Sequence, residues 1–158
     1  MNKPLKYLGY SVVFQEVPNE VSLAINISGC PYKCRGCHSQ YLWEYKGNNL
    51  VDDFDSLLAK YDGLITCVCF MGGDQNSCDL IHCLEMAKRQ GLKTCLYTGA
   101  SAIGDVDSRV VELLDYIKIG RYIEDAGGLD SITTNQHMYN LVNHTEIFFN
   151  GREDINNG

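Results

Sequence analysis

Residues 63–74 read Gly-Leu-Ile-Thr-Cys-Val-Cys-Phe-Met-Gly-Gly-Asp, and this stretch decides the fold. The apolar run Leu64–Met71 is typical of a β-strand that is buried on both faces. Gly72 and Gly73 follow it at once and predict a sharp turn. A strand of this kind lies inside a sheet that other elements cover, so the stretch indicates an α/β fold.

Strand and helix patterns alternate on both sides of this run. The expected strands lie at 10–16, 21–28, 93–97, 116–119 and 145–149, and the expected helices at 52–61, at 78–90 and from 107 or 108. Asp52 or Asp53 is the expected cap of the first helix. This order predicts right-handed crossovers and a mostly parallel sheet.

The chain length limits how many strand-helix units this fold can hold. The chain has 158 residues, which suits a single domain over 1–158, and the polar tail 152–158 is expected to be loose. A closed eight-fold barrel needs roughly 31 residues per β/α unit, so this chain holds about five units. A closed barrel is therefore excluded unless it forms by oligomerisation.

Charge and cysteine content narrow the class of function. The chain carries 20 acidic and 13 basic residues, a net charge of −7, which disfavours nucleic acid and anionic membranes as partners. No apolar run approaches the ~20 residues that span a bilayer, and the first residues lack the apolar core of a secretory signal. We therefore expect a cytoplasmic protein, in which eight cysteines suggest metal or redox chemistry.

Unusual residues follow each expected core strand at its carboxyl end. They are Cys30, Gly72–Asp74, Tyr97–Gly99 and Gly120–Tyr122. Because functional groups gather beyond the carboxyl ends of parallel strands, we expect these segments to form one site.

Three of the cysteines are crowded into one short segment. Cys30, Cys34 and Cys37 have the spacing C-x3-C-x2-C, in a stretch with Gly and Pro that can turn three thiolates toward one centre. A 4Fe–4S cluster on three thiolates keeps one iron open for substrate. The alternatives are a structural zinc site with a fourth ligand, or buried thiols without a metal. His38 directly follows Cys37, and consecutive residues seldom reach the same ion.

The cysteine spacing resembles the cluster segment of the radical S-adenosylmethionine superfamily. The resemblance implies a 4Fe–4S cluster whose open iron binds S-adenosylmethionine and whose electron cleaves it to a 5′-deoxyadenosyl radical. Gly72, Gly73 and Asp74 resemble the superfamily's Gly-Gly-Glu motif, which meets the amino group of that cofactor. Thr98 then lies at its carboxylate or ribose, or in a plain turn.

The wider sequence resembles the small activating proteins of anaerobic ribonucleotide reductase. The resemblance extends from Tyr10 to Leu141 and includes the segments 20–30, 36–39, 116–124, 127–131 and 133–136. Gly36 fits this group, and His38 takes a position on the adenine side of the cofactor.

This narrower resemblance implies a glycyl radical activating enzyme. Its partners are anaerobic ribonucleoside-triphosphate reductase, whose glycine loses a hydrogen atom from Cα, and a low-potential electron donor such as flavodoxin. We expect an incomplete open (β/α) barrel, with a lateral mouth for the partner's backbone. The alternatives are an activase of another glycyl radical enzyme, another small radical S-adenosylmethionine enzyme, and a non-catalytic electron-transfer or metal-stabilised interaction module.

Other polar residues and cysteines have structural interpretations. The remaining five cysteines are expected as core residues, because free cysteine behaves as a small hydrophobe. Lys118 and Arg121 are interpreted as surface cations, with contact to a carboxylate or to the partner as the alternative. Asn135 and Gln136 are interpreted as organisers of a loop beside the site.

Overall fold

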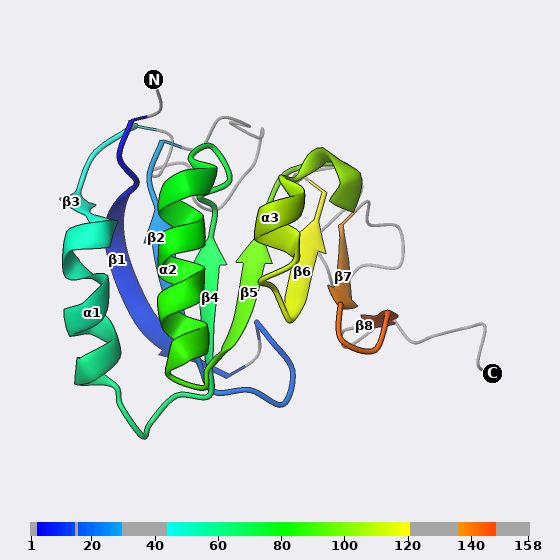
Figure 1. The fold of residues 1–158 in the computed structure, drawn as a ribbon, viewed down its shortest axis with the longest axis horizontal. Helices are drawn as coiled ribbons and strands as arrows, with labels where there is room; N and C mark the ends of the chain where they lie inside the picture. Colours follow the sequence, from blue (N-terminus) through cyan, green and yellow to red (C-terminus); the bar gives the residue numbers. More distant parts are fainter. Residues whose placement is uncertain (1–2, 15, 30–43, 121–135, 148–158) are drawn as a thin grey trace.

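The computed structural model describes residues 3–14, 16–29, 44–120 and 136–147, and its eight strands form one open sheet (Figure 1). The strands run in the order β3-β1-β2-β4-β5-β6-β7-β8. Their bounds are β1 Lys6–Val13, β2 Ser22–Ile27, β3 Asn48–Asn49, β4 Cys67–Met71, β5 Lys93–Tyr97, β6 Tyr116–Ile119, β7 His137–Asn140 and β8 Thr145–Ile147. The helices are α1 Leu50–Lys60, α2 Ser77–Arg89 and α3 Ser108–Val111, with a 3-10 turn, η2, at Ile103–Asp105.

The sheet is mixed rather than mostly parallel. The central strands β2, β4, β5 and β6 pair in parallel, as the strand-helix alternation predicts. The outer pairs β1–β2, β1–β3, β6–β7 and β7–β8 are antiparallel. In β1–β2 and β7–β8 the two strands are consecutive and joined by short connections, which favour antiparallel pairing. These pairings give an open sheet and do not by themselves show a barrel.

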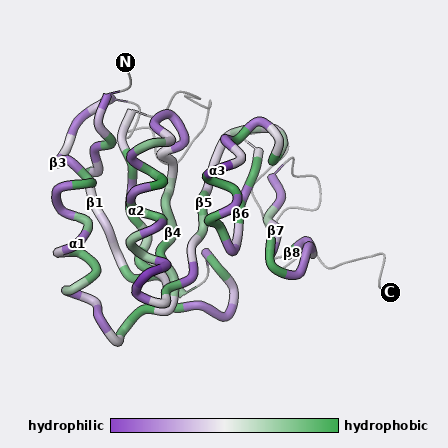
Figure 2. Tube along the Cα trace, viewed as in Figure 1, coloured by the Kyte–Doolittle hydropathy of each residue, from purple (hydrophilic) through white to green (hydrophobic). Residues whose placement is uncertain are grey.

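The three helices cover one face of the sheet (Figure 1). The main core forms there, where Phe54 of α1 meets Phe70 of β4 with ring centroids 5.7 Å apart, and Leu80 and Leu84 of α2 are fully buried. Figure 2 shows hydrophobic residues along β4, whereas α1 and α2 alternate between hydrophobic and hydrophilic. Burial of this kind contributes about 1.5–3 kcal/mol for each large side chain.

A second, smaller core lies on the other face of the sheet. It contains Val17, Cys67, Cys69, Cys95, Tyr116 and Met138, all of them buried. Alternation along each strand produces this face, since Cys67 and Cys69 are two residues apart in β4 and Cys95 pairs with Cys69 in register.

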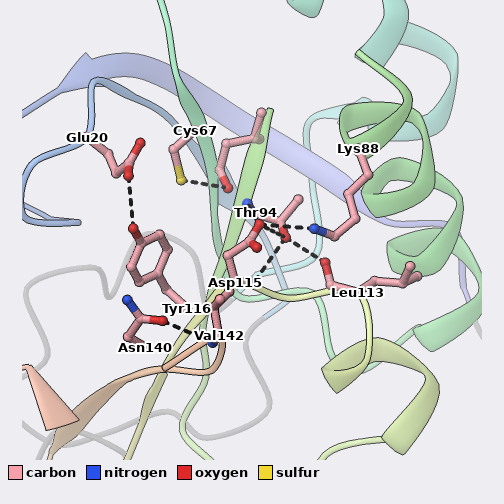
Figure 3. Close-up of polar contacts among 10 residues, drawn as sticks. Glu20, Cys67, Lys88, Thr94, Leu113, Asp115, Tyr116, Asn140 and Val142 are labelled. Carbon is pink, nitrogen blue, oxygen red and sulfur yellow. Dashed lines mark hydrogen bonds and ion pairs between the residues drawn. The ribbon is translucent and has the colours of Figure 1, made fainter. Parts of the chain in front are cut away.

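Polar contacts fix the amino ends of β5 and β6 (Figure 3). The Asp115 carboxylate accepts hydrogen bonds from Lys88 Nζ at 3.0 Å and from the Thr94 backbone N–H at 2.9 Å. The Thr94 hydroxyl donates to the Leu113 carbonyl at 2.6 Å, and Tyr116 donates to Glu20 at 2.9 Å. These hydrogen bonds therefore hold the amino ends of β5 and β6 to each other, to α2 and to Glu20.

Several predicted elements differ from the structure. The first strand is Lys6–Val13 rather than 10–16, because its antiparallel register with β2 begins at Tyr7. Helix α1 begins at Leu50, since the Asn49 side chain and not Asp52 or Asp53 caps it by accepting from Val51 N–H. Strands β3 and β7 were not predicted, whereas β5 and β6 have the predicted bounds.

Candidate functional site

The candidate site lies at the carboxyl edge of the four parallel strands. Gly29, Gly72, Gly73 and Gly120 follow the strands β2, β4 and β6 there, and all have positive φ between 76° and 114°. Such backbone conformations are strained for residues with a Cβ, so these glycines let the chain turn sharply away from the sheet.

The segment that contains the three clustered cysteines begins and ends at one place on this edge. The Gly29 N–H donates to the Glu44 carbonyl at 3.2 Å. The Ser28 hydroxyl donates to the Lys46 carbonyl and accepts from the Lys46 N–H at 3.1 Å. Residues 28–29 and 44–46 are therefore hydrogen-bonded to each other and hold the two ends of the intervening segment side by side. We call these residues the neck. Cys30, Cys34, Cys37, Gly36 and His38 belong to that segment and lie outside the described residues.

Two predicted site residues from neighbouring strands are in direct contact. The Thr98 hydroxyl donates to Asp74 Oδ2 at 2.8 Å and accepts from the Ala100 N–H at 3.1 Å. The backbone reinforces this contact, because the Gly72 N–H donates to the Tyr97 carbonyl at 3.0 Å. The Gly-Gly-Asp turn after β4 and the turn after β5 therefore form one rigid unit.

Gln75 connects this unit to the neck, a role that no pattern in the sequence predicts. Its Nε2 donates to the Ser28 carbonyl at 3.2 Å, and its Oε1 accepts from the Gly73 N–H at 3.1 Å. One side chain thus fixes the glycine turn relative to the entry of the cysteine segment. The only signal in the sequence is the position of Gln75 directly after Gly-Gly-Asp.

Lys118 is buried, and its interpretation as a surface cation was wrong. Only 8% of the residue is exposed, and Nζ donates to the Thr98 and Gly120 carbonyls, both at 3.1 Å. It also lies 5.4 Å from the centroid of the Tyr97 ring. The Gln136 amide donates to the Gly120 carbonyl at 3.3 Å, so it organises this edge as expected. Arg121 and Asn135 lie outside the described residues.

Three of the described cysteines lie in surroundings that disfavour the thiolate form. Burial raises the pKa of Cys67 and of Cys95 well above the ordinary value, and it raises the pKa of Cys83 to about 12. Metal ligation requires the thiolate, which these sites disfavour. Across the part of the chain that the structure describes, no group of three or more His, Cys, Asp or Glu side chains is arranged to hold a metal ion. The interpretation as core residues is confirmed for Cys67, Cys69, Cys83 and Cys95, which are buried, and is wrong for Cys78, which is exposed on α2.

A comparison with family models identifies the family of the chain. The family model described as a 4Fe-4S single cluster domain matches residues 20–144. The chain belongs to this family. The 4Fe-4S single cluster domain spans the neck, the glycine turn and β2 to β7. No curated protein and no solved structure matches the chain. The family match confirms the prediction of an iron–sulfur protein with a 4Fe–4S cluster.

The donor set of the chain fits such a cluster. Cys30, Cys34 and Cys37 would supply three thiolates within eight residues of the sequence, and thiolates are the usual protein ligands of iron–sulfur clusters. The closed neck holds the two ends of their segment together, as a compact ligand set requires.

Over the described residues, no helix is long and apolar enough to cross a membrane.

Proposed function

We propose that this protein is a glycyl radical activating enzyme of the radical S-adenosylmethionine type, acting on anaerobic ribonucleotide reductase in the cytoplasm. The observation that carries the proposal is the Gln75 side chain, which connects the Gly-Gly-Asp turn to the neck of the cysteine segment. Cluster ligands and a cofactor-binding turn must lie side by side if one molecule is to touch both. Such a cluster, when bound and reduced, gives one electron to the sulfonium of S-adenosylmethionine, which yields methionine and a 5′-deoxyadenosyl radical.

The residues of the chain have distinct parts in this proposal. Cys30, Cys34 and Cys37 hold the cluster. Asp74 offers a carboxylate to the ammonium of the cofactor, and the hydrogen bond from Thr98 fixes the direction of that carboxylate. Gly72 and Gly73 let the backbone approach the cofactor closely. Gly36 and His38 are proposed to lie beside the cluster and on the adenine side.

The open sheet supports a protein segment as the substrate. The described strands end at β3 on one side and β8 on the other, without closure. We propose that the sheet functions as an incomplete (β/α) barrel. A pocket for a free metabolite buries most of its ligand, whereas a backbone loop of a partner brings part of its own cover. Abstraction of hydrogen from a glycine Cα in such a loop is favourable, since the neighbouring nitrogen and carbonyl delocalise the radical.

Asp74 is expected to contribute to cofactor affinity but not to cluster retention. A charge-assisted hydrogen bond is worth about 1.5–3 kcal/mol, so Asp74→Ala should weaken S-adenosylmethionine binding by roughly one to two decades. Asp74→Asn is the matched control, because it retains an acceptor for Thr98 and loses the charge. Equilibrium dialysis with anaerobic protein measures the affinity of both variants for S-adenosylmethionine. Unchanged affinity in Asp74→Ala would show that the residue only shapes the turn.

The partner is tested by electron spin resonance. Mixing the reconstituted protein with reductase, S-adenosylmethionine and a reductant should produce a doublet signal from a glycyl radical. Replacement of the reductase glycine by Ala should remove the signal without preventing complex formation. A reductase that stays free of radical, together with efficient activation of another glycyl radical enzyme, would support the alternative activase. Absence of a radical on either enzyme would contradict the activase assignment.

A further inference from the structure

Several sulfur-containing side chains lie together on the face of the sheet opposite the helices. Cys67, Cys69 and Cys95 are fully buried in the second core, and Met71 packs against that core. The Cys69 thiol donates a hydrogen bond to the Met71 sulfur at 3.6 Å. Cys95 of β5 lies in register with Cys69 of β4, so their side chains share this face on neighbouring strands. The second core therefore contains a connected set of sulfur atoms.

Met71 connects these thiols to the candidate site. It is the last residue of β4, it is partly exposed, and it directly precedes the turn at residues 72–74. Cys69 lies two residues before Met71 on the same face, which places it farther from the turn. A reactive group at the glycine turn therefore meets Met71 first, and the Cys69 thiol lies directly behind it.

The surroundings of the thiols keep them protonated. Burial raises the pKa of Cys95 well above its ordinary value, and a hydrogen bond with the Cys69 thiol adds to the rise. A protonated thiol is a poor nucleophile and a poor metal ligand. It still has an S–H bond, which is weaker than a C–H bond, so it can give a hydrogen atom to a carbon radical. Hydrogen-atom transfer is therefore the chemistry for which this pair of thiols is suited.

The two thiols are also placed to form a disulfide bond. Neighbouring strands lie about 4.8 Å apart, and disulfides join residues whose Cα atoms are about 4.4–6.8 Å apart. Cys69 and Cys95 are in register and both are free. Cys67 lies on the same face, but its partner in register on β5 is Lys93. A disulfide between Cys69 and Cys95 therefore requires no change in the register of β4 and β5.

We propose that Cys69 and Cys95 form a radical trap behind the candidate site, with Met71 as its entrance. The proposal rests on the proposed function, which produces a carbon radical at the open edge of the sheet. When no partner loop is bound, that radical has no substrate and reacts with the protein instead. A trap next to the glycine turn limits this damage to one pair of side chains.

The trap uses hydrogen atoms alone, and its steps balance. A carbon radical takes a hydrogen atom from the Met71 methyl group next to sulfur, and Met71 regains one from the Cys69 thiol. The Cys95 thiol then passes its hydrogen atom to Cys69 along their hydrogen bond. A second carbon radical removes that atom by the same route, and the two sulfur radicals combine. Two carbon radicals thus gain two hydrogen atoms, the two thiols lose them and one S–S bond forms, without a further oxidant or reductant.

Peptide mapping tests the trap through a product in the protein itself. Anaerobically reconstituted protein is mixed with S-adenosylmethionine and methyl viologen radical, without a partner enzyme, and is then alkylated and digested with trypsin. We expect a disulfide between the peptides 61–88 and 94–109, with fragment ions that place it at Cys69 and Cys95. Its amount should not exceed one for every two molecules of 5′-deoxyadenosine released. Omission of S-adenosylmethionine should abolish it.

Variants with a matched control locate the trap. Cys69→Ala should form no disulfide to the peptide that contains Cys95. Cys83→Ala is the control, because Cys83 is also fully buried and burial raises its pKa to about 12, but it lies in the main core beneath α2. That control should form as much disulfide as the wild type. Met71→Leu keeps an apolar side chain but lacks the sulfur, so it should lower the amount of disulfide per 5′-deoxyadenosine.

The outcomes separate the trap from the proposed function. Release of 5′-deoxyadenosine without the disulfide, or equal disulfide in Cys69→Ala and Cys83→Ala, would overturn the trap and leave the proposed function intact. A protein that releases no 5′-deoxyadenosine contradicts the proposed function. The trap is then decided with carbon radicals of 2-propanol, made by γ-irradiation of an anaerobic solution. Formation of the disulfide between Cys69 and Cys95 under these conditions would sustain the trap, and its absence would overturn it.

Discussion

Replacement of Cys34 by Ala is expected to leave the protein without its iron. The wild type, reconstituted anaerobically, should hold about four iron atoms and show the broad absorption of a 4Fe–4S cluster. Three thiolates are the smallest set that holds such a cluster with an open iron, and loss of one leaves too few ligands. Cys30→Ala and Cys37→Ala should have the same effect. Iron analysis and visible absorption measure the outcome.

Cysteines outside the segment supply the matched controls for this loss. Cys78→Ala removes an exposed thiol from α2, and Cys95→Ala removes a buried thiol from β5. Both variants should retain the iron and the absorption, although Cys95→Ala should unfold more readily because it leaves a small void in the second core. The assignment is wrong if Cys95→Ala loses the cluster while Cys34→Ala keeps it.

Gly47→Ala is expected to have the largest effect on stability among the described glycines. A Cβ at this position would lie 2.1 Å from the Tyr7 carbonyl oxygen, and φ is +109°. Positive φ costs about 1–2 kcal/mol for a residue with a Cβ, and the clash with backbone adds about 1–3 kcal/mol. For a domain of this size, the melting temperature should fall by roughly 5–15 °C. Far-UV circular dichroism during heating measures it.

Gly63→Ala separates the cost of positive φ from the cost of the steric clash at Gly47. Gly63 also has positive φ, +79°, but a Cβ there would meet nothing within 4 Å. It should therefore show the backbone cost alone, with a fall of about 2–6 °C. Equal losses in the two variants would mean that the chain relieves the clash at Gly47 without cost. Because Gly47 directly follows the neck, Gly47→Ala should also retain less iron than Gly63→Ala.

Local sequence predicted those elements whose pattern is strong on its own. Strands β5 and β6 have the predicted bounds, since short apolar runs between clear stop signals define them. Strand β7, His137-Met-Tyr-Asn, carries no such pattern and forms because it pairs with β6, with Tyr116 opposite Asn140. The same tertiary pairing moves β1 to an earlier start than its own residues indicate.

The sequence predicted which segments of the candidate site lie close together, but not which side chains bond to one another there. Parallel strands place their carboxyl ends together, and this rule alone brought Asp74 and Thr98 to one edge. The contacts of Gln75 and Lys118 depend on the conformations that these long side chains adopt on the folded backbone. Lys118 is buried because strand alternation points it to the second-core face, where two carbonyls accept its hydrogen bonds. No pattern in the sequence distinguishes such a lysine from an exposed one.

The most direct test of the central claim is the fate of S-adenosylmethionine with the reduced protein. Anaerobic, iron-reconstituted protein is mixed with S-adenosylmethionine and a reductant, and products are separated by chromatography. The wild type should release 5′-deoxyadenosine and methionine in equal amounts, and Cys34→Ala should release neither. A wild-type protein that holds its 4Fe–4S cluster, accepts an electron and still releases no 5′-deoxyadenosine, alone or with reductase, would contradict the account and favour a non-catalytic electron-transfer module.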